Sequence, residues 1–146
     1  MDIQILIRTF GHKYGPPPVD AQIVFDARII PNPHSHPGME TLTGYDQPVE
    51  QFIRAHPALD ALLENISLQV DPLITGQLLG NTLVIAIGCK GGRQRSVCVA
   101  RLCADLFENL LRARRMQARV ELEHRDLEHD LQLEFGKGAN VYATAS

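Results

Sequence analysis

The feature that most constrains the fold of this sequence is an apolar run that leads directly into glycines. Residues 82–87 read Thr-Leu-Val-Ile-Ala-Ile, and residues 88–92 read Gly-Cys-Lys-Gly-Gly. A short run that is apolar on both faces is typical of a central parallel strand, which helices cover from both sides. From Arg93 to Arg115, apolar residues recur at helical spacing on two sides, which predicts a well-buried helix.

Further strands and helices are expected around this unit. The strands are predicted at residues 3–10, 22–30 and 118–124, and the helices begin at Asp46 and at Pro57. The segment 67–80 favours no particular element. A strand, a helix and the next strand in this order form a right-handed βαβ unit. The expected fold class is therefore α/β, with a small sheet of about four mainly parallel strands flanked by helices.

The size and composition of the chain suit one globular domain, since it has 146 residues and 45% of them are hydrophobic. We expect residues 1–130 to form this domain and residues 131–146, which carry little pattern, to be a flexible tail. No apolar run approaches the roughly 18 residues of a membrane span, and the N-terminus lacks a signal-peptide pattern. Three cysteines, an odd number, do not indicate a disulfide framework. We therefore expect a cytoplasmic protein that does not contact a membrane.

The glycine-rich segment from Gly88 to Ser96 carries the strongest functional signal. It follows the predicted central strand and opens the helix, at the edge where open α/β sheets bind ligands. Helix N-termini present backbone N–H groups and a partial positive charge, and glycines let these groups close around an anion. Arg93 and Arg95 would add charge-assisted hydrogen bonds. The segment predicts an anion-binding loop for a phosphate or carboxylate; the alternative is a glycine turn with solvated arginines.

The same segment has the spacing of cysteine-dependent phosphatases, with Cys89, five residues, Arg95 and Ser96. In that class a thiolate attacks phosphorus and the arginine stabilises the phosphate oxygens. Two features weaken this alternative. Gly88 stands where the class usually has histidine, and no aspartate occupies an obvious acid-bearing loop. The aspartates that remain as candidates for the acid are Asp26, Asp46 and Asp126.

Basic residues gather in two segments that contain no acid, although the formal net charge is −3. The first is 90–101, which includes the glycine-rich segment. The second holds four arginines: Arg112, Arg114, Arg115 and Arg119. A basic face on an acidic protein indicates an anionic partner. These arginines, together with the loop, are candidates for RNA binding, and the aromatic content of 5% favours contacts to RNA phosphates over base stacking. The alternative is a solvated helix end, where arginines suit the helix dipole.

No metal ion and no organic cofactor is expected. His34 and His36 flank Ser35, but no cysteine or carboxylate cluster accompanies them as further metal ligands. His34 is instead a candidate hydrogen-bonding contact to a ligand, against the alternative of an ordinary loop histidine. The sequence has no phosphate-binding loop of the P-loop NTPase type.

Four blocks of the sequence, in order, resemble the C-terminal domain of RapZ proteins. They are Phe10–Gly15 with Phe25–His34, Leu42–Val49, Ala86–Val97 and His124–Glu128. The resemblance implies a bacterial adapter that binds a small regulatory RNA and presents it to an endoribonuclease. It also implies a domain that resembles a sugar-phosphate-binding fold, senses glucosamine-6-phosphate and self-associates, so that a homo-oligomer is expected.

By motif position, the resemblance assigns six residues to a phosphosugar pocket: Asp26, His34, Cys89, Lys90, Gly91 and Arg95. Gly92, Arg93 and Ser96 of the same loop complete the candidate ligand site. The family's N-terminal NTPase domain has no counterpart in this sequence, Lys90 replaces a usual threonine and Gln94 replaces a usual histidine. These departures leave open another phosphorylated metabolite or a nucleotide as ligand. The expected function is a non-catalytic regulatory module that binds a phosphorylated metabolite.

Overall fold

The computed structural model describes residues 3–76 and 81–135. The strands are β1 (Ile3–Gly11), β2 (Ile23–Asp26), β3 (Thr82–Cys89) and β4 (Ala118–His124). The helices are α1 (Gln47–Arg54), α2 (Pro57–Thr75), α3 (Arg95–Ala113) and α4 (Leu127–Phe135). Short 3-10 helices lie at His12–Tyr14, Ala27–Ile29 and Pro33–Ser35. None of the helices in these ranges is both long and apolar enough to cross a membrane.

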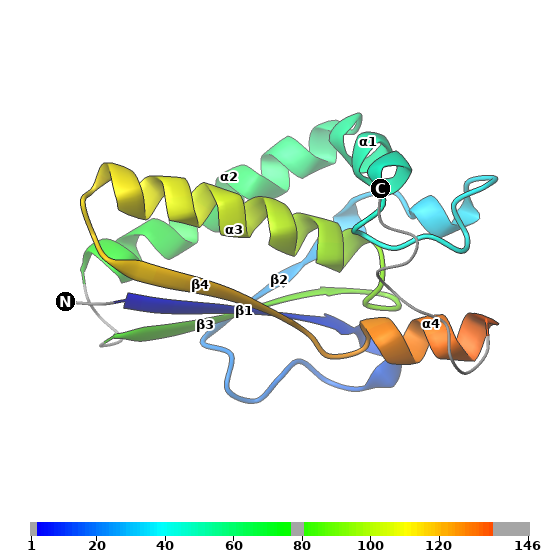
Figure 1. Cartoon of the computed structure of the whole chain (residues 1–146), viewed down its shortest axis with the longest axis horizontal. Coiled ribbons are helices and arrows are strands. Elements are labelled where there is room, and N and C mark those ends of the chain that lie inside the picture. The colour runs from blue at the N-terminus through cyan, green and yellow to red at the C-terminus, as the bar shows by residue number, and fades with distance from the viewer. Residues whose placement is uncertain (1–2, 77–80, 136–146) are drawn as a thin grey trace.

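The strands form one parallel sheet in the order β2-β3-β1-β4, which confirms the expected α/β class. Helices α2 and α3 lie along one face of the sheet, and the segment between β1 and β2 lies on the other side (Figure 1). The register pairs Gly11 with Cys89, and Asp26 with Gly88. The carboxyl ends of β1, β2 and β3 therefore meet at one edge, where parallel α/β sheets bind their ligands.

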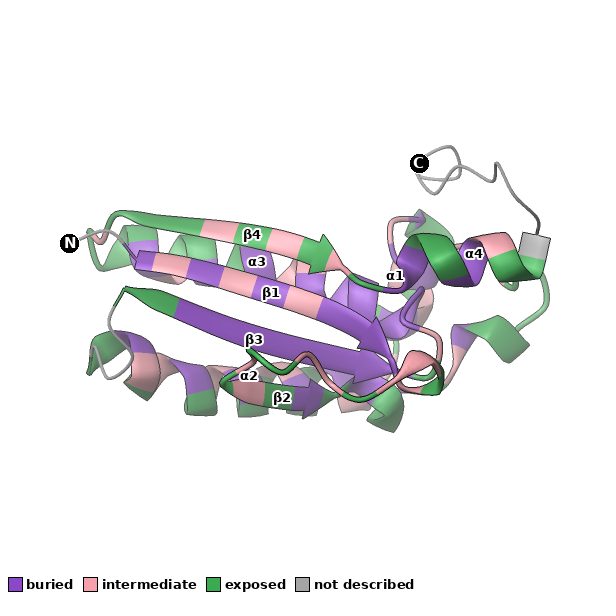
Figure 2. Ribbon diagram, turned by 90° about the horizontal axis from the view of Figure 1, so that it is seen from below, coloured by how far each residue is buried: buried purple, intermediate pink, exposed green. Residues whose placement is uncertain are grey.

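The hydrophobic core lies between the sheet and the helices. Ile5 and Ile7 of β1, Ile87 of β3 and Phe107 of α3 are at most 1% exposed. Burial of each such side chain stabilises the fold by about 1.5–3 kcal/mol. Strand β3 is buried almost throughout, whereas β4 at the sheet edge alternates between exposed and half-buried residues (Figure 2). This rigid core fixes the position of the loop that follows β3.

Two expected element boundaries are corrected by local hydrogen bonding and packing. The strand expected over residues 22–30 ends at Asp26, because the side chain of Asp26 accepts a hydrogen bond from Arg28 N and a 3-10 helix begins. The segment 67–80, for which no element was expected, belongs to α2 as far as Thr75, with Pro72 inside the helix. There the buried side chains of Val70 and Ile74 continue the inner face of the helix.

Helix α4 packs through a small hydrophobic cluster that is separate from the main core. Leu127 and Leu131 contact Val97 near the start of α3, with Tyr45 alongside. The domain boundary expected at residue 130 thus lies inside α4, and residues 131–135 of the expected tail are helical. The rest of that tail, residues 136–146, lies outside the described residues. The cluster places α4 beside the loop that follows β3 (Figure 1).

Candidate functional site

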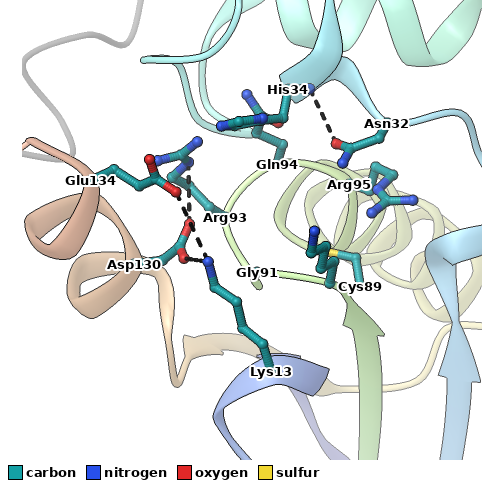
Figure 3. A pocket seen from close by; sticks show the side chains of 11 residues that line it. Lys13, Asn32, His34, Cys89, Gly91, Arg93, Gln94, Arg95, Asp130 and Glu134 are labelled. Carbon is teal, nitrogen blue, oxygen red and sulfur yellow. Dashed lines mark hydrogen bonds and ion pairs between the residues drawn. The ribbon is translucent and has the colours of Figure 1, made fainter.

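A pocket opens at the carboxyl edge of the sheet, around the loop that joins β3 to α3 (Figure 3). Six of the residues that the sequence analysis selected line it: His34, Cys89, Lys90, Gly91, Arg93 and Arg95. Five more lining residues were not selected: Lys13, Asn32, Gln94, Asp130 and Glu134. The pocket has a volume of about 80 Å³. A water molecule needs roughly 10–15 Å³ of such space, so the oxygens of one phosphate group fit inside.

The glycines after β3 let the loop pack directly against the end of β1. Gly92 has φ +70°, a conformation that disfavours any other residue, and a Cβ there would lie 2.6 Å from the nitrogen of Gly11. The carbonyl of Lys90 also accepts a hydrogen bond from Lys13 N at 3.1 Å. The segment after β1 is therefore held against the loop, which brings the Lys13 side chain into the pocket wall.

The residues at and just before the start of α3 are buried, and they tie the loops around the pocket together. Arg93 Nη2 donates to the carbonyl of Glu40 at 2.8 Å, and Gln94 Nε2 donates to the carbonyls of Met39 and Leu42. Arg95 Nη1 donates to the carbonyl of Ile30 at 3.0 Å. The alternative of solvated arginines is wrong, because Arg93 is only 3% exposed and Arg95 only 7% exposed.

The two buried guanidinium groups differ in their electrostatic surroundings. Arg93 Nε lies 3.5 Å from Asp130 Oδ2, so this cation has a carboxylate beside it. Arg95 takes part in none of the ion pairs between described residues, and its hydrogen-bond partner among them is the neutral carbonyl of Ile30. A buried charge is costly unless an opposite charge or good hydrogen bonds compensate it. The wall formed by Arg95 is therefore suited to an anion.

Cys89 forms the floor of the pocket and contacts the start of α3. Its Sγ accepts a hydrogen bond from Ser96 N at 3.4 Å and lies 3.2 Å from Ser96 Oγ. Ser96 itself is fully buried behind the loop, and neither it nor Gly92 lines the pocket.

The aspartates considered as the acid of a phosphatase do not line the pocket, and each has a structural partner. Asp46 accepts from Thr43 N at 2.8 Å, and Asp126 accepts from Gly11 N at 2.7 Å. Asp26 pairs with Arg28 at 2.8 Å. The geometry gives the cysteine-dependent phosphatase alternative no support.

Asp26 lies at the same sheet edge as the pocket but outside its lining. The Arg28 guanidinium beside it lowers the pKa of the Asp26 carboxyl, so that the group is ionised at neutral pH. On the other side of the pocket, Asn32 and His34 come from the loop after β2, and Asn32 Oδ1 accepts a hydrogen bond from His34 N at 3.1 Å (Figure 3).

Asp130 of α4 is the most connected carboxylate of the pocket, and the sequence analysis did not select it. Its Oδ1 lies 2.7 Å from Lys13 Nζ and accepts a hydrogen bond from the hydroxyl of Tyr14. The hydrogen bond to Asp130 raises the pKa of Lys13; burial, with this carboxylate beside it, raises the pKa of Tyr14 to about 12. One signal in the sequence could have predicted the helix that carries Asp130: Leu127 and Leu131 stand four residues apart, as on one face of a helix.

The arginines considered for RNA binding lie at the other end of the molecule. Arg112, Arg114, Arg115 and Arg119 follow or end α3 and begin β4, and all four are exposed. Because α3 has 19 residues, it separates its start at the pocket from its end by about 28 Å. The loop and these arginines therefore do not form one continuous surface. Arg114 also pairs with Asp71 at 2.6 Å.

Comparison with known proteins places the chain in a family. The family model for the RapZ C-terminal domain matches residues 3–128. A nucleotide-binding protein of Ralstonia nicotianae is 37% identical over 131 residues, which are 88% of this chain and 42% of that protein. A nucleotide-binding protein of Desulforudis audaxviator is 39% identical over 125 residues, 84% of this chain and 40% of that protein. The chain thus spans less than half the length of these relatives. With most of its residues matched, it belongs to the RapZ C-terminal domain family.

Proposed function

We propose that this chain is a non-catalytic module that binds a phosphorylated small molecule at the loop between β3 and α3. The observation that carries the proposal is Arg95, a buried guanidinium on the pocket wall that pairs with no carboxylate of the described residues. A phosphate group would supply the missing opposite charge, and the planar guanidinium suits phosphate geometry.

Three further features of the pocket support an anionic ligand. Lys90 adds a second cation, which takes part in no ion pair between the described residues. Helix α3 starts at the pocket, and its N-terminal backbone carries a partial positive charge. The side chain of Gln94, the N-cap residue, makes no capping hydrogen bond to the helix; its Nε2 donates to the carbonyl of Met39 in the loop before α1. The pocket is therefore electropositive on the side of α3.

Two classes of ligand are the first to test. A phosphosugar such as glucosamine-6-phosphate follows from the resemblance described above. A nucleotide follows from the names of the two relatives, which are nucleotide-binding proteins, although this chain matches only 40–42% of their length. The volume of about 80 Å³ fits a phosphate group, so the sugar or nucleoside part would lie over the mouth of the pocket, near His34 and Asn32.

A thermal-shift screen followed by calorimetry tests the proposal. Inorganic phosphate, glucosamine-6-phosphate and nucleoside phosphates are titrated into the wild-type protein, Arg95→Ala and Arg112→Ala. A ligand at 100 times its Kd stabilises the protein by about 2.7 kcal/mol, which a melting curve detects easily. Arg95→Ala should lose this shift. Arg112→Ala removes the same charge at the far end of α3 and should keep it. If none of the compounds shifts the wild-type melt, the proposal is wrong.

A second candidate function, RNA binding, is favoured by the arginine cluster at the far end of α3. Arg112, Arg115 and Arg119 are exposed, and within the described part of the chain the one ion pair of Arg119 is a long contact of 3.8 Å to Glu121. Such a cluster would contact RNA phosphates and serve an adapter that presents RNA to a ribonuclease. Binding through phosphates should weaken steeply with salt, so a gel-shift series at rising salt checks it. A flat salt response would reject this function, and so would unchanged RNA binding by the double variant Arg115→Ala and Arg119→Ala.

A further inference from the structure

The pocket contains carboxylates as well as cations, and this is unexpected for a site that takes a phosphate group. Asp130 and Glu134 of α4 line the same pocket as Lys13 and Arg93 (Figure 3). Asp130 is 3% exposed, and its two oxygens contact Lys13 Nζ at 2.7 Å and Arg93 Nε at 3.5 Å. Two pocket cations are therefore engaged by a carboxylate that the protein itself supplies.

From this geometry we infer that Asp130 is a built-in competitor for the anion, so that anion binding and the docking of α4 on the pocket oppose each other. The inference rests on the proposed function and adds a regulatory element to it. A phosphate group that draws Lys13 or Arg93 toward itself takes that cation away from Asp130, because each ion pair depends on the same few N–H donors. An anion in the pocket also stands close to Asp130, which adds like-charge repulsion.

The position of Asp130 against the glycine-rich loop supports direct competition between its carboxylate and an anionic ligand. A Cβ built on Gly91 would lie 3.0 Å from Asp130 Oδ2, so the carboxylate rests on the glycine-rich loop. Lys13 is able to exchange partners, since its side chain is 38% exposed and carries its charge on a flexible stem. The carboxylate thus lies at the loop that is proposed to receive the ligand's phosphate.

The way in which α4 is attached means that competition for the partners of Asp130 would affect the docking of the whole helix. The apolar contacts of α4 are those of Leu127 and Leu131 with Val97 and Tyr45, a cluster much smaller than the main core, and the ring of His129 also contacts that of Tyr14. The ion pairs of Asp130 therefore make a substantial part of the contacts that hold the second turn of α4. Coupling between two sites is reciprocal: if docked α4 weakens anion binding, the bound anion weakens α4 docking by the same factor.

Asp130→Asn tests the inference, because it keeps the size of the side chain and removes its charge. Calorimetry with inorganic phosphate compares the wild-type protein, Asp130→Asn and Glu128→Gln. Asp130→Asn should bind phosphate about tenfold more tightly, within the usual range of allosteric coupling. Glu128→Gln removes the same charge from an exposed position of the same helix and should bind like the wild type. Hydrogen–deuterium exchange of the unmodified protein gives an independent measurement: phosphate should speed exchange of the amides of 127–135.

The outcomes separate this inference from the proposed function. Weaker or unchanged phosphate binding by folded Asp130→Asn would overturn the competition, as would phosphate binding to the wild type without faster exchange in α4. If Asp130→Asn does not fold, the exchange measurement on the wild-type protein decides alone. If none of the three proteins binds inorganic phosphate, glucosamine-6-phosphate or a nucleoside phosphate, the proposed function is wrong and the inference falls with it.

Discussion

Arg95 donates a hydrogen bond from Nη1 to the carbonyl of Ile30 at 3.0 Å, and this contact joins the start of α3 to the loop after β2. This guanidinium thus joins two parts of the fold and also lines the pocket, and its other N–H groups have no hydrogen-bond partner among the described residues. A lysine keeps the charge but has a single ammonium in place of the planar fork. Arg95→Lys should therefore weaken phosphate binding about tenfold while the protein remains folded. Calorimetry with inorganic phosphate measures this, and an unchanged Kd would show that only the charge matters.

The loop backbone can be tested at Gly92 against a second glycine of similar conformation. Gly38 has φ +86° with open space around it, so Gly38→Ala should cost only the conformational strain, about 1–2 kcal/mol. At Gly92 the same strain is joined by a Cβ that would lie 2.6 Å from Gly11 N. Gly92→Ala should therefore cost roughly 3 kcal/mol or more. Urea denaturation compares the two variants, and equal losses would contradict the close packing of the loop on β1.

The separate docking of α4 leads to a local prediction. Leu131 is 3% exposed in the cluster with Val97, whereas Leu133 on the same helix is 65% exposed. Leu131→Ala should cost about 2 kcal/mol of α4 docking, the low end of the range for buried leucines. Hydrogen exchange should then quicken in 127–135 but not in β3, because local opening involves only that unit. Leu133→Ala should change neither. Equal acceleration in β3 would show that α4 unfolds only with the whole domain.

The central unit of the fold could be predicted from the sequence because its signals are local. These signals follow one another along the chain: the apolar run of β3, the glycines, the helical spacing of α3 and the alternation of β4. The end of β2 could not be predicted in this way, since it depends on hydrogen bonds of the turn itself, from Arg28 N to Asp26 and from Ile30 N to the carbonyl of Ala27. Pro72 obscured the end of α2, where burial of Ile74 outweighs the lost backbone hydrogen bond.

The candidate site was predictable only as far as it lies on one stretch of chain. His34 apart, the lining residues selected by sequence lie on the continuous stretch from the end of β3 at Cys89 to the start of α3 at Arg95. Lys13 enters because β1 pairs with β3 at Gly11 and Cys89, a register that only the sheet order reveals. Asp130 enters because α4 docks on α3, more than 30 positions away in sequence from the loop it contacts.

The half-buried side chain of His124 leads to the last prediction, a stability that depends on pH. Its Nδ1 lies 2.7 Å from Thr9 Oγ1 and its Nε2 lies 2.8 Å from the hydroxyl of Tyr45, so the ring joins β1, β4 and the segment before α1. Burial, with a smaller effect of the nearby Arg101 charge, lowers the pKa of His124 from 6.5 to about 4. The folded protein therefore favours the neutral ring.

Between pH 6.5 and 4 the unfolded chain binds a proton at this position that the folded protein does not. His124 should thus contribute its full stability above pH 6.5, and roughly 3 kcal/mol should be lost as the pH falls to 4. His124→Gln has no such titration, and its amide can still bond to Thr9 and Tyr45. The free energy of unfolding, measured in urea from pH 7 to pH 4, should fall less steeply for His124→Gln than for the wild type. Parallel curves would mean that the imidazole is protonated equally in the folded and unfolded states, so that folding does not lower its pKa.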